Sequence, residues 1–162
     1  MLPFLHRTHG FGDVACYWAI VFAANIVGTL LFAAAATAPH LFKPEAVHAF
    51  NELGSKAVAP GFPVVLMKGV VAGWLIALMV WLMPASASAK FYVIIAVTWL
   101  IAAGEFSHVI AGSSEAAFAA MQGSIGWPQY VAGFLIPALI GNSIGGTVFV
   151  ALLNHAQVKE EI

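Results

Sequence analysis

Residues 91–112 read FYVIIAVTWLIAAGEFSHVIAG, an apolar run with a group of polar residues near its end. A transmembrane helix needs about 20 predominantly apolar residues to cross roughly 30 Å of hydrocarbon. Three further stretches meet that requirement, at 14–38, 62–83 and 130–154. We therefore predict an all-α integral membrane protein with four transmembrane helices, which form a single membrane domain over residues 1–162.

The composition of the chain supports a membrane protein. Hydrophobic residues make up 62% and charged residues 8% of the sequence, whereas a typical soluble domain carries about 25% charged residues. A chain of 162 residues cannot bury this much apolar surface and still present a polar exterior, so the lipid bilayer is the expected surrounding. The net charge of −1, with six scattered Lys and Arg residues, argues against a nucleic-acid partner. Cys16 is the single cysteine, which excludes an internal disulfide.

The connecting segments predict a topology. Residues 44–56 are polar and compatible with a helix, which we expect to lie along a membrane surface. An even number of spans places both termini on one side, and the positive-inside rule favours the cytoplasm for that side. The basic residues counted there are Arg7, Lys90 and Lys159, against Lys43 and Lys56 on the other side. Lys68 lies either inside the second span or, as we favour, at its interface with the ammonium group extended towards water.

The third span is expected to be a broken helix. Its last part carries a carboxylate, a hydroxyl group and an imidazole, from Glu105, Ser107 and His108. Ser113 or Ser114 is a suitable N-cap for a new, short half-helix over 114–122. Irregular backbone at membrane depth persists only where it is buried in protein or faces a water-filled cavity. The alternative is an unbroken helix that ends at Gly112 and is followed by a surface helix.

His108 is the strongest functional candidate in the sequence. An ionisable group inside a span normally faces the bundle interior or an aqueous path, and burial disfavours a charged imidazole. We expect a neutral ring that hydrogen-bonds a small anion, or protonates it so that the neutral acid crosses the membrane. The alternative is a structural histidine bonded to Ser107, Glu105 or a backbone carbonyl. The other histidines lie at or beyond the ends of the predicted spans, which argues against haem; no cofactor, metal or enzymatic activity is expected.

The first and last spans share a short repeat. Asn25 and Gly28 in the first span have the same spacing as Asn142 and Gly145 in the last. Residues at this spacing lie on one helix face, where a small residue and an amide suit close helix packing with an interhelical hydrogen bond. Transporters built from repeats hold a polar site between their two halves, so the repeat is a weak indication of transport.

Two motifs resemble the formate/nitrite transporter family. They are GEFSHVIA at 104–111 and IPALIGNSIGG at 136–146, and AGWLIALMVW at 72–81 is similar to the family's fourth helix. The resemblance covers the family's third to sixth helices, and it implies the C-terminal two-thirds of an aquaporin-like channel for small monovalent anions or their weak acids. It further implies a homopentamer with one pore per subunit. The family's first two helices have no counterpart, so we expect a fragment or a short version whose missing wall comes from another subunit.

The same resemblance assigns pore residues by position. His108 corresponds to the central pore histidine, in the break of the fifth helix. The motif of the sixth helix corresponds to Asn142, Gly145 and Gly146. The apolar constriction falls near Ile101 and Ile76, and the outer-mouth lysine falls near Lys56.

Two residues depart from the family pattern. Ser107 stands where the family usually has a glutamate, with Glu105 close before it, and Gly73 replaces a polar asparagine of the fourth helix. These departures fit an outlying subgroup of the family. The alternative to a channel is a non-transporting structural or vestigial membrane protein, and a membrane redox enzyme is the least favoured interpretation.

Overall fold

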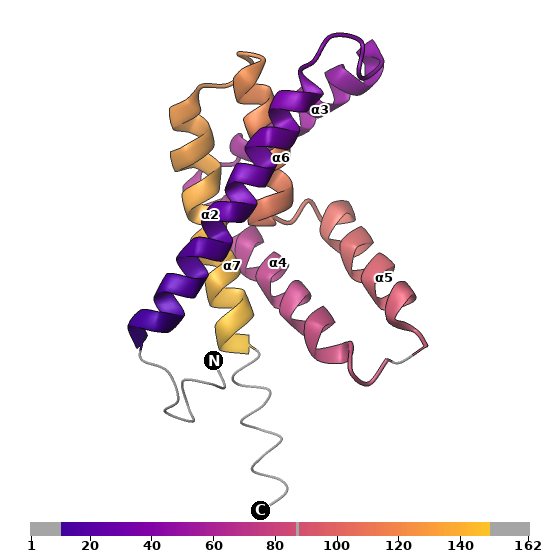
Figure 1. The fold of residues 1–162 in the computed structure, drawn as a ribbon, viewed down its shortest axis with the longest axis vertical. Helices are drawn as coiled ribbons and strands as arrows, with labels where there is room; N and C mark the ends of the chain where they lie inside the picture. Colours follow the sequence, from indigo (N-terminus) through magenta and orange to yellow (C-terminus); the bar gives the residue numbers. More distant parts are fainter. Residues whose placement is uncertain (1–10, 87, 150–162) are drawn as a thin grey trace, which may run out of the picture.

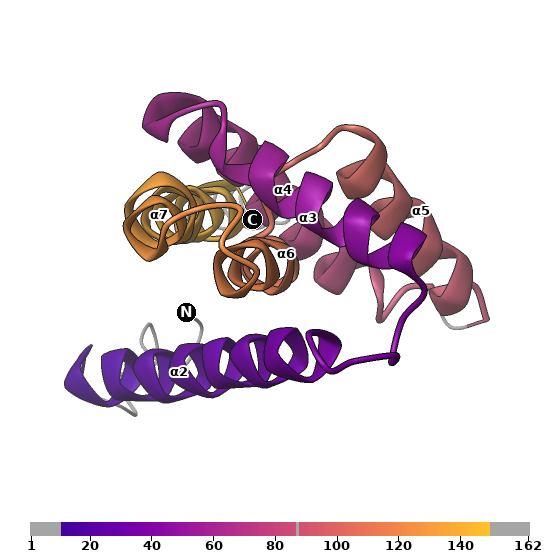
Figure 2. The same cartoon turned by 90° about the horizontal axis from the view of Figure 1, so that it is seen from above.

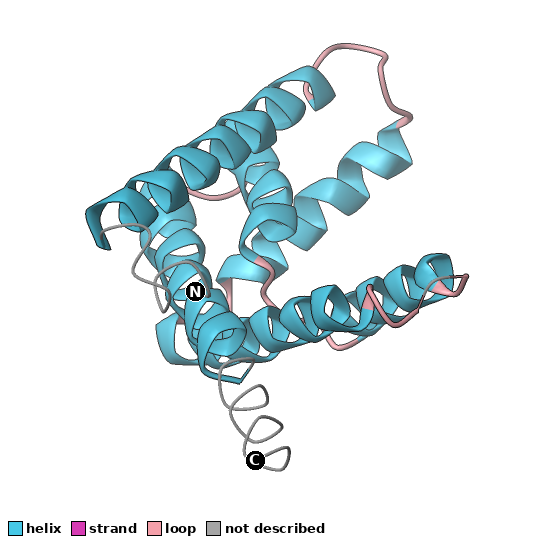
Figure 3. Ribbon diagram, turned by 60° about the horizontal axis from the view of Figure 1, so that its bottom comes forward, coloured by secondary structure: helices cyan, strands magenta, loops and turns pink. Residues whose placement is uncertain are grey.

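The computed structural model describes residues 11–86 and 88–149, and this part of the chain consists of helices joined by short turns (Figure 1; Figure 3). The first five helices are α2 (Phe11–Ala36), α3 (Pro44–Val58), α4 (Phe62–Leu82), α5 (Lys90–Ala103) and α6 (Val109–Met121). A last, continuous helix contains two π-helical sections and is made of η1 (Gln129–Leu135), α7 (Ile136–Ile144) and η2 (Gly145–Phe149). The predicted all-α class is confirmed for the described residues.

Three helices of the described part are long and apolar enough to cross a membrane, and they cover Gly12–Ala36, Phe62–Leu82 and Gln129–Val148. The other predicted span, 91–112, is divided between α5, with 14 residues, and α6, with 13 residues. Each of these is about 20 Å long and too short to cross alone. The predicted break is therefore present, and only three of the four predicted spans are continuous helices of full length. Residues 150–154 of the last predicted span lie outside the described residues.

Large apolar side chains face outward along α2 and α5. α2 packs mainly on α6, and α5 packs mainly on α4, so most of the surface of both helices is uncovered (Figure 2). The exposed residues on these two helices include Tyr17, Ile20, Leu31, Phe91 and Trp99. Apolar surface on this scale is typical of a protein whose surroundings are lipid or another protein chain.

Four glycines bring α4 and α7 into close contact. Gly69 and Gly73 on α4, and Gly141 and Gly145 on α7 and η2, form two Gly-x-x-x-Gly pairs. A Cβ atom at Gly141 would overlap a carbonyl oxygen of α4, and one at Gly73 would overlap the backbone of Asn142. Small residues at this spacing allow helix backbones to approach closely. The α4–α7 pair therefore forms a rigid scaffold, and this scaffold carries Asn142.

Asn25 and Gly28, for which the sequence predicts close helix packing, contact no other helix within the described chain, so their packing role stays a prediction. Both residues are exposed, and the Asn25 side-chain amide donates to the Val21 carbonyl of its own helix at 2.8 Å. No atom lies within 4 Å of a Cβ built on Gly28. The physical reason is that α2 and α6 separate here and leave a second cavity of about 350 Å³, which Ile110 and Ser114 line from the α6 side.

The predicted helix over 44–56 is confirmed as α3, which begins at Pro44 and extends to Val58. Proline suits the first position of a helix because its missing N–H would have no helical partner there. α3 packs on α6 through Gly54, where a Cβ would overlap the Glu115 carbonyl and approach the Ala119 Cβ at 2.7 Å. The position of α3 along a membrane surface and the cytoplasmic orientation of the termini stay predictions. Arg7 and Lys159, which support that orientation, lie outside the described residues.

Candidate functional site

The helix break is built from two backbone motifs, and the first of them ends α5. The Phe106 N–H donates to the Ile101 carbonyl at 2.9 Å, and the Glu105 N–H donates to the Ala102 carbonyl at 3.1 Å. This pair of bonds is the Schellman motif of helix C-termini, whose turning residue adopts the left-handed conformation and is usually glycine. Here the turning residue is Glu105, with φ 48°. The chain thus leaves α5 through a residue that is not the favoured one for the turn.

The second motif begins α6, and His108 supplies its cap. His108 has the extended conformation of an N-cap residue, and its Nδ1 accepts a hydrogen bond from the Ala111 N–H at 3.3 Å. Ser113 and Ser114, the predicted caps, lie inside α6 instead, so the position of the second half-helix was wrong. The imidazole already satisfies a donor of the first turn, which allows α6 to begin before the serines.

The cap bond fixes the chemistry of the imidazole. Because Nδ1 accepts a hydrogen bond, a neutral ring must carry its proton on Nε2. None of the residues from 11–86 and 88–149 forms a hydrogen bond with Nε2. Ser107 and Glu105, the partners that a purely structural histidine was expected to use, do not bond the ring. His108 therefore has one structural nitrogen and one nitrogen that is available to a solute.

Asn142 holds the break against the α4–α7 scaffold. Its Oδ1 accepts a hydrogen bond from the Val109 N–H at 2.9 Å. Its Nδ2 donates to the Ser107 carbonyl at 2.7 Å and to the Gly69 carbonyl at 2.9 Å. One side chain thus binds the backbone on both sides of His108 and ties it to α4. The interhelical hydrogen bond that the sequence repeat predicted is present for Asn142, whereas Asn25 makes none.

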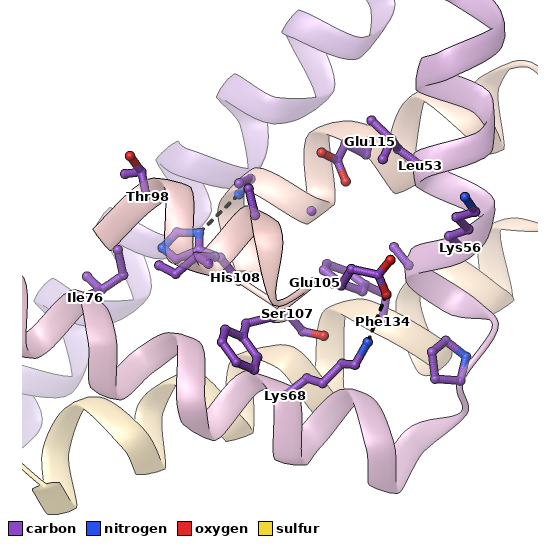
Figure 4. A pocket seen from close by; sticks show the side chains of 17 residues that line it. Leu53, Lys56, Lys68, Ile76, Thr98, Glu105, Ser107, His108, Glu115 and Phe134 are labelled. Carbon is purple, nitrogen blue, oxygen red and sulfur yellow. Dashed lines mark hydrogen bonds and ion pairs between the residues drawn. The ribbon is translucent and has the colours of Figure 1, made fainter. Parts of the chain in front are cut away.

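A cavity of about 440 Å³ lies beside the break, between α3, α4, α5 and α6 (Figure 4). Six of the predicted pore residues line it, namely Lys56, Ile76, Ile101, Glu105, Ser107 and His108. Asn142, Gly145 and Gly146 do not line this cavity, and they lie on the part of the C-terminal helix that packs against α4. Their contacts with α4 assign them a structural contribution: Asn142 holds the break, and Gly145 allows the helices to approach.

Several residues of the cavity wall were not predicted from the sequence. The polar ones are Lys68, Thr98 and Glu115, and the aromatic ones are Phe106 and Phe134. Glu115 follows His108 by two helical turns, and Ala111 and Gly112 lie between them on the same face of α6. With the helix start at Val109, the spacing of seven residues would have predicted that Glu115 and His108 lie on the same face. Phe134 packs against Gly112, where no side chain would fit.

Both lysines of the cavity are paired with carboxylates. Lys68 Nζ lies 3.4 Å from Glu105 Oε2, and this ion pair joins α4 to the break (Figure 4). Lys56 Nζ lies 2.7 Å from Glu52 Oε1 on the exposed surface of α3. The hydrogen bond from Lys56 holds the pKa of Glu52 below its usual value, which favours the charged form of the carboxylate. Among the described residues, Glu115 has no basic side chain within ion-pair distance.

Residues 1–156 match the family described as formate/nitrite transporter. The chain belongs to the formate/nitrite transporter family. This membership confirms the resemblance found in the sequence, and it makes the protein a homologue of membrane transporters.

Two curated proteins are similar in sequence to this chain. It is 37% identical over 145 residues to the inner membrane protein YfdC of Escherichia coli (strain K12), a match that covers 90% of this chain and 47% of the relative. It is 32% identical over 152 residues to the uncharacterized transporter YrhG of Bacillus subtilis (strain 168), covering 87% of this chain and 54% of the relative. The chain thus spans about half the length of the curated relatives it matches. No solved structure matches it.

Proposed function

We propose that this formate/nitrite transporter homologue is a subunit of a membrane channel for small monovalent weak acids or their anions, and that His108 binds the solute. The observation that carries the proposal is the imidazole in the helix break, whose Nε2 is available at the wall of a cavity of about 440 Å³. An ion in a low-dielectric path is costly. A neutral ring offers the solute a hydrogen bond but no compensating positive charge, so the desolvation cost favours passage of the uncharged acid over its anion.

The cap bond bears on whether His108 can donate a proton to the solute. To protonate an anion, the ring would first need a second proton on Nδ1, which would break its bond with the Ala111 N–H. After transfer from Nε2 the remaining proton would still occupy Nδ1, so the cap would not re-form. The geometry therefore favours His108 as a hydrogen-bond donor to the solute, and the predicted role as proton donor is the second candidate.

Two further features belong to the same proposal. α5 and α6 act together as one discontinuous crossing, with the break at the level of the cavity, as in transporters whose polar sites lie at broken helices. The subunit works in a homo-oligomer, for which family resemblance suggests a pentamer, in a cytoplasmic membrane with both termini in the cytoplasm. The exposed apolar surface of α2 and α5 supports burial against lipid or other subunits.

A transport assay on the reconstituted full chain tests the proposal. Formic acid entry into proteoliposomes is followed by stopped flow with an entrapped pH dye, as the initial rate above that of protein-free liposomes. His108→Asn should abolish this rate, because asparagine is a good N-cap but its shorter side chain does not place a donor where Nε2 lies. His48→Asn on the exposed face of α3 is the matched control and should behave as the native protein. Equal rates for native protein and His108→Asn would refute the role of His108, and native rates at the protein-free level would support a non-transporting membrane protein.

A further inference from the structure

Ser107, the residue directly before His108, has a hydroxyl group that the fold itself does not use. The residue is 7% exposed, yet its hydroxyl forms no hydrogen bond with any residue from 11–86 or 88–149. We propose that Ser107 and Lys68 together form a second binding position for the solute, at which both side chains donate hydrogen bonds to its oxygen atoms. The role of this position in transport rests on the proposed function, whereas the binding itself is tested separately.

The burial of the Ser107 hydroxyl is the first support for this binding position. A buried polar group without a protein partner is normally satisfied by a water molecule or by a bound ligand. The hydroxyl groups of Ser113 and Tyr130 are enclosed by protein atoms, whereas Ser107 lines the cavity of about 440 Å³. The Ser107 hydroxyl is therefore a buried donor that a solute in the cavity can reach.

The backbone around Ser107 is fixed before any solute arrives. Its carbonyl oxygen accepts a hydrogen bond from Asn142 Nδ2 at 2.7 Å, and the Val109 N–H donates to Asn142 Oδ1 at 2.9 Å. One side chain on the α4–α7 scaffold thus holds the backbone on both sides of the break. A donor that is positioned in advance costs less ordering entropy when it binds a ligand.

Lys68 supplies the second donor from α4. Its side chain is 29% exposed and lines the same cavity as Ser107. Its Nζ lies 3.4 Å from Glu105 Oε2, which is beyond the usual range of strong hydrogen bonds, and an ammonium group has three N–H donors. Lys68 therefore keeps donors for a solute while it is paired with Glu105. In Figure 4 the Ser107 side chain lies towards this pair, whereas the His108 ring lies towards Ile76.

The two donors define the chemistry of the ligand. A hydroxyl and an ammonium group on one wall of a cavity suit a solute with two oxygen acceptors on one central atom, such as a monocarboxylate or nitrite. A halide ion presents a single acceptor atom and does not bridge two separated donors in this way. The break then carries two binding positions in succession, one at Ser107 and one at His108, and weak binding at several sites favours passage.

The test measures binding and transport on the full chain. Binding is followed in detergent as the increase in the thermal unfolding temperature with sodium formate, compared with sodium chloride at equal ionic strength. Transport is followed as the formate concentration that gives half-maximal entry into proteoliposomes. Ser107→Ala removes the hydroxyl and Ser107→Thr keeps it. Ser114→Ala is the matched control, because the Ser114 hydroxyl donates to the Ile110 carbonyl within α6 and lines the other cavity.

We expect Ser107→Ala to raise the formate concentration for half-maximal stabilisation and for half-maximal entry by about five- to tenfold, the effect of losing one hydrogen bond to the solute. Ser107→Thr and Ser114→Ala should match the native protein. Lys68→Gln should also weaken binding, and its effect in combination with Ser107→Ala should be smaller than the product of the single effects, because both side chains contact one solute molecule. The unfolding temperature of Ser107→Ala without formate should equal that of the native protein, since no hydrogen bond within the protein is lost.

Three results would overturn the proposal. They are a native response to formate in Ser107→Ala, equal stabilisation of the native protein by chloride and formate, and a lowered unfolding temperature of Ser107→Ala in the absence of formate, which would assign the hydroxyl to the fold. Stabilisation by formate that depends on Ser107, together with native transport at the protein-free level, would support the binding position and refute the proposed transport function.

Discussion

The Asn142 side chain offers the sharpest test of how the break is held. Asn142→Ala removes three hydrogen bonds at once: the one that Val109 N–H donates and the two that Ser107 and Gly69 accept. Asn142→Asp keeps the acceptor for Val109 but loses both donors and turns a carboxylate towards two carbonyl oxygens. Asn25→Ala is the matched control, because its amide is exposed and bonds only within α2.

The magnitude follows from the number of bonds and their surroundings. Side-chain hydrogen bonds in membrane proteins contribute about 0.6 kcal/mol each on average, so three bonds give a lower estimate of about 2 kcal/mol. Each buried backbone group left without a partner costs about 1–3 kcal/mol. Because Asn142 is only partly buried, water can replace part of the lost bonding, so we take about 5 kcal/mol as the upper estimate for the three bonds together. We expect both Asn142 variants to lower the free energy of unfolding by about 2–5 kcal/mol. The Asn25 control should stay within about 0.5 kcal/mol of the native protein.

Two measurements read this change separately. Equilibrium unfolding in mixed micelles gives the free energy, and hydrogen–deuterium exchange followed by mass spectrometry gives the protection of the peptide around Val109. Both Asn142 variants should lose protection at the break before the rest of α6 does, because the Val109 amide loses its acceptor or the break loses its anchor. Native free energy together with native protection in Asn142→Ala would refute the view that this side chain holds the break.

The remaining predictions concern packing, the turn and the surface pair. Gly145→Ala should destabilise the fold strongly, because its Cβ would overlap the Val70 carbonyl, whereas Gly28→Ala should be neutral or stabilising since its surroundings are open; thermal unfolding of the two variants in detergent checks this contrast. Glu105→Gly should raise the free energy of unfolding by about 1 kcal/mol, since it relieves a left-handed non-glycine residue, and an unchanged or lower value in mixed micelles would contradict the strain assigned to it. The Glu52 pKa lies below its usual value because Lys56 donates a hydrogen bond, so the pair is fully formed above the ordinary glutamate pKa and is lost as the pH falls through the lowered one; carbon-13 NMR titration of Glu52, with and without Lys56→Met, should show that shift and its disappearance.

Much of the helical arrangement follows from length and hydropathy. The apolar runs that became α2, α4 and the C-terminal helix are long enough to span hydrocarbon. The polar residues around His108 predicted a break because irregular backbone needs a protected or wet environment. The Gly-x-x-x-Gly pair at Gly69 and Gly73 was not predicted, although glycine at this spacing is a known signal of helix contact.

The details of the site depended on three-dimensional contacts that spacing does not encode. Serine is a common cap and histidine is not, so Ser113 and Ser114 were expected to begin the half-helix that His108 begins in fact. Because the predicted half-helix began too late, Glu115 was not placed on the helix face that carries His108, and it was left out of the predicted site. The Lys68–Glu105 pair joins residues from two helices that pack side by side, and no local pattern predicts such a meeting.

The repeat in the first and last helices also shows that local sequence does not determine contacts. Asn25 and Asn142 have equivalent local sequences, but only Asn142 lies opposite backbone groups that need a partner. At Asn25 a cavity separates α2 from α6, so the Asn25 side-chain amide donates to a carbonyl of its own helix. The motif provides an amide for an interhelical hydrogen bond, but the bond forms only where a neighbouring helix offers a partner.

The central claim is that the Nε2 of His108 carries the proton and faces water inside the membrane. Solid-state nitrogen-15 NMR of histidine-labelled protein in lipid bilayers tests it most directly, with the His108 signals assigned by their loss in His108→Asn. We predict a neutral ring protonated at Nε2, with magnetisation transfer from water to that nitrogen. A ring protonated at Nδ1, or an Nε2 that receives no magnetisation from water, would contradict the account.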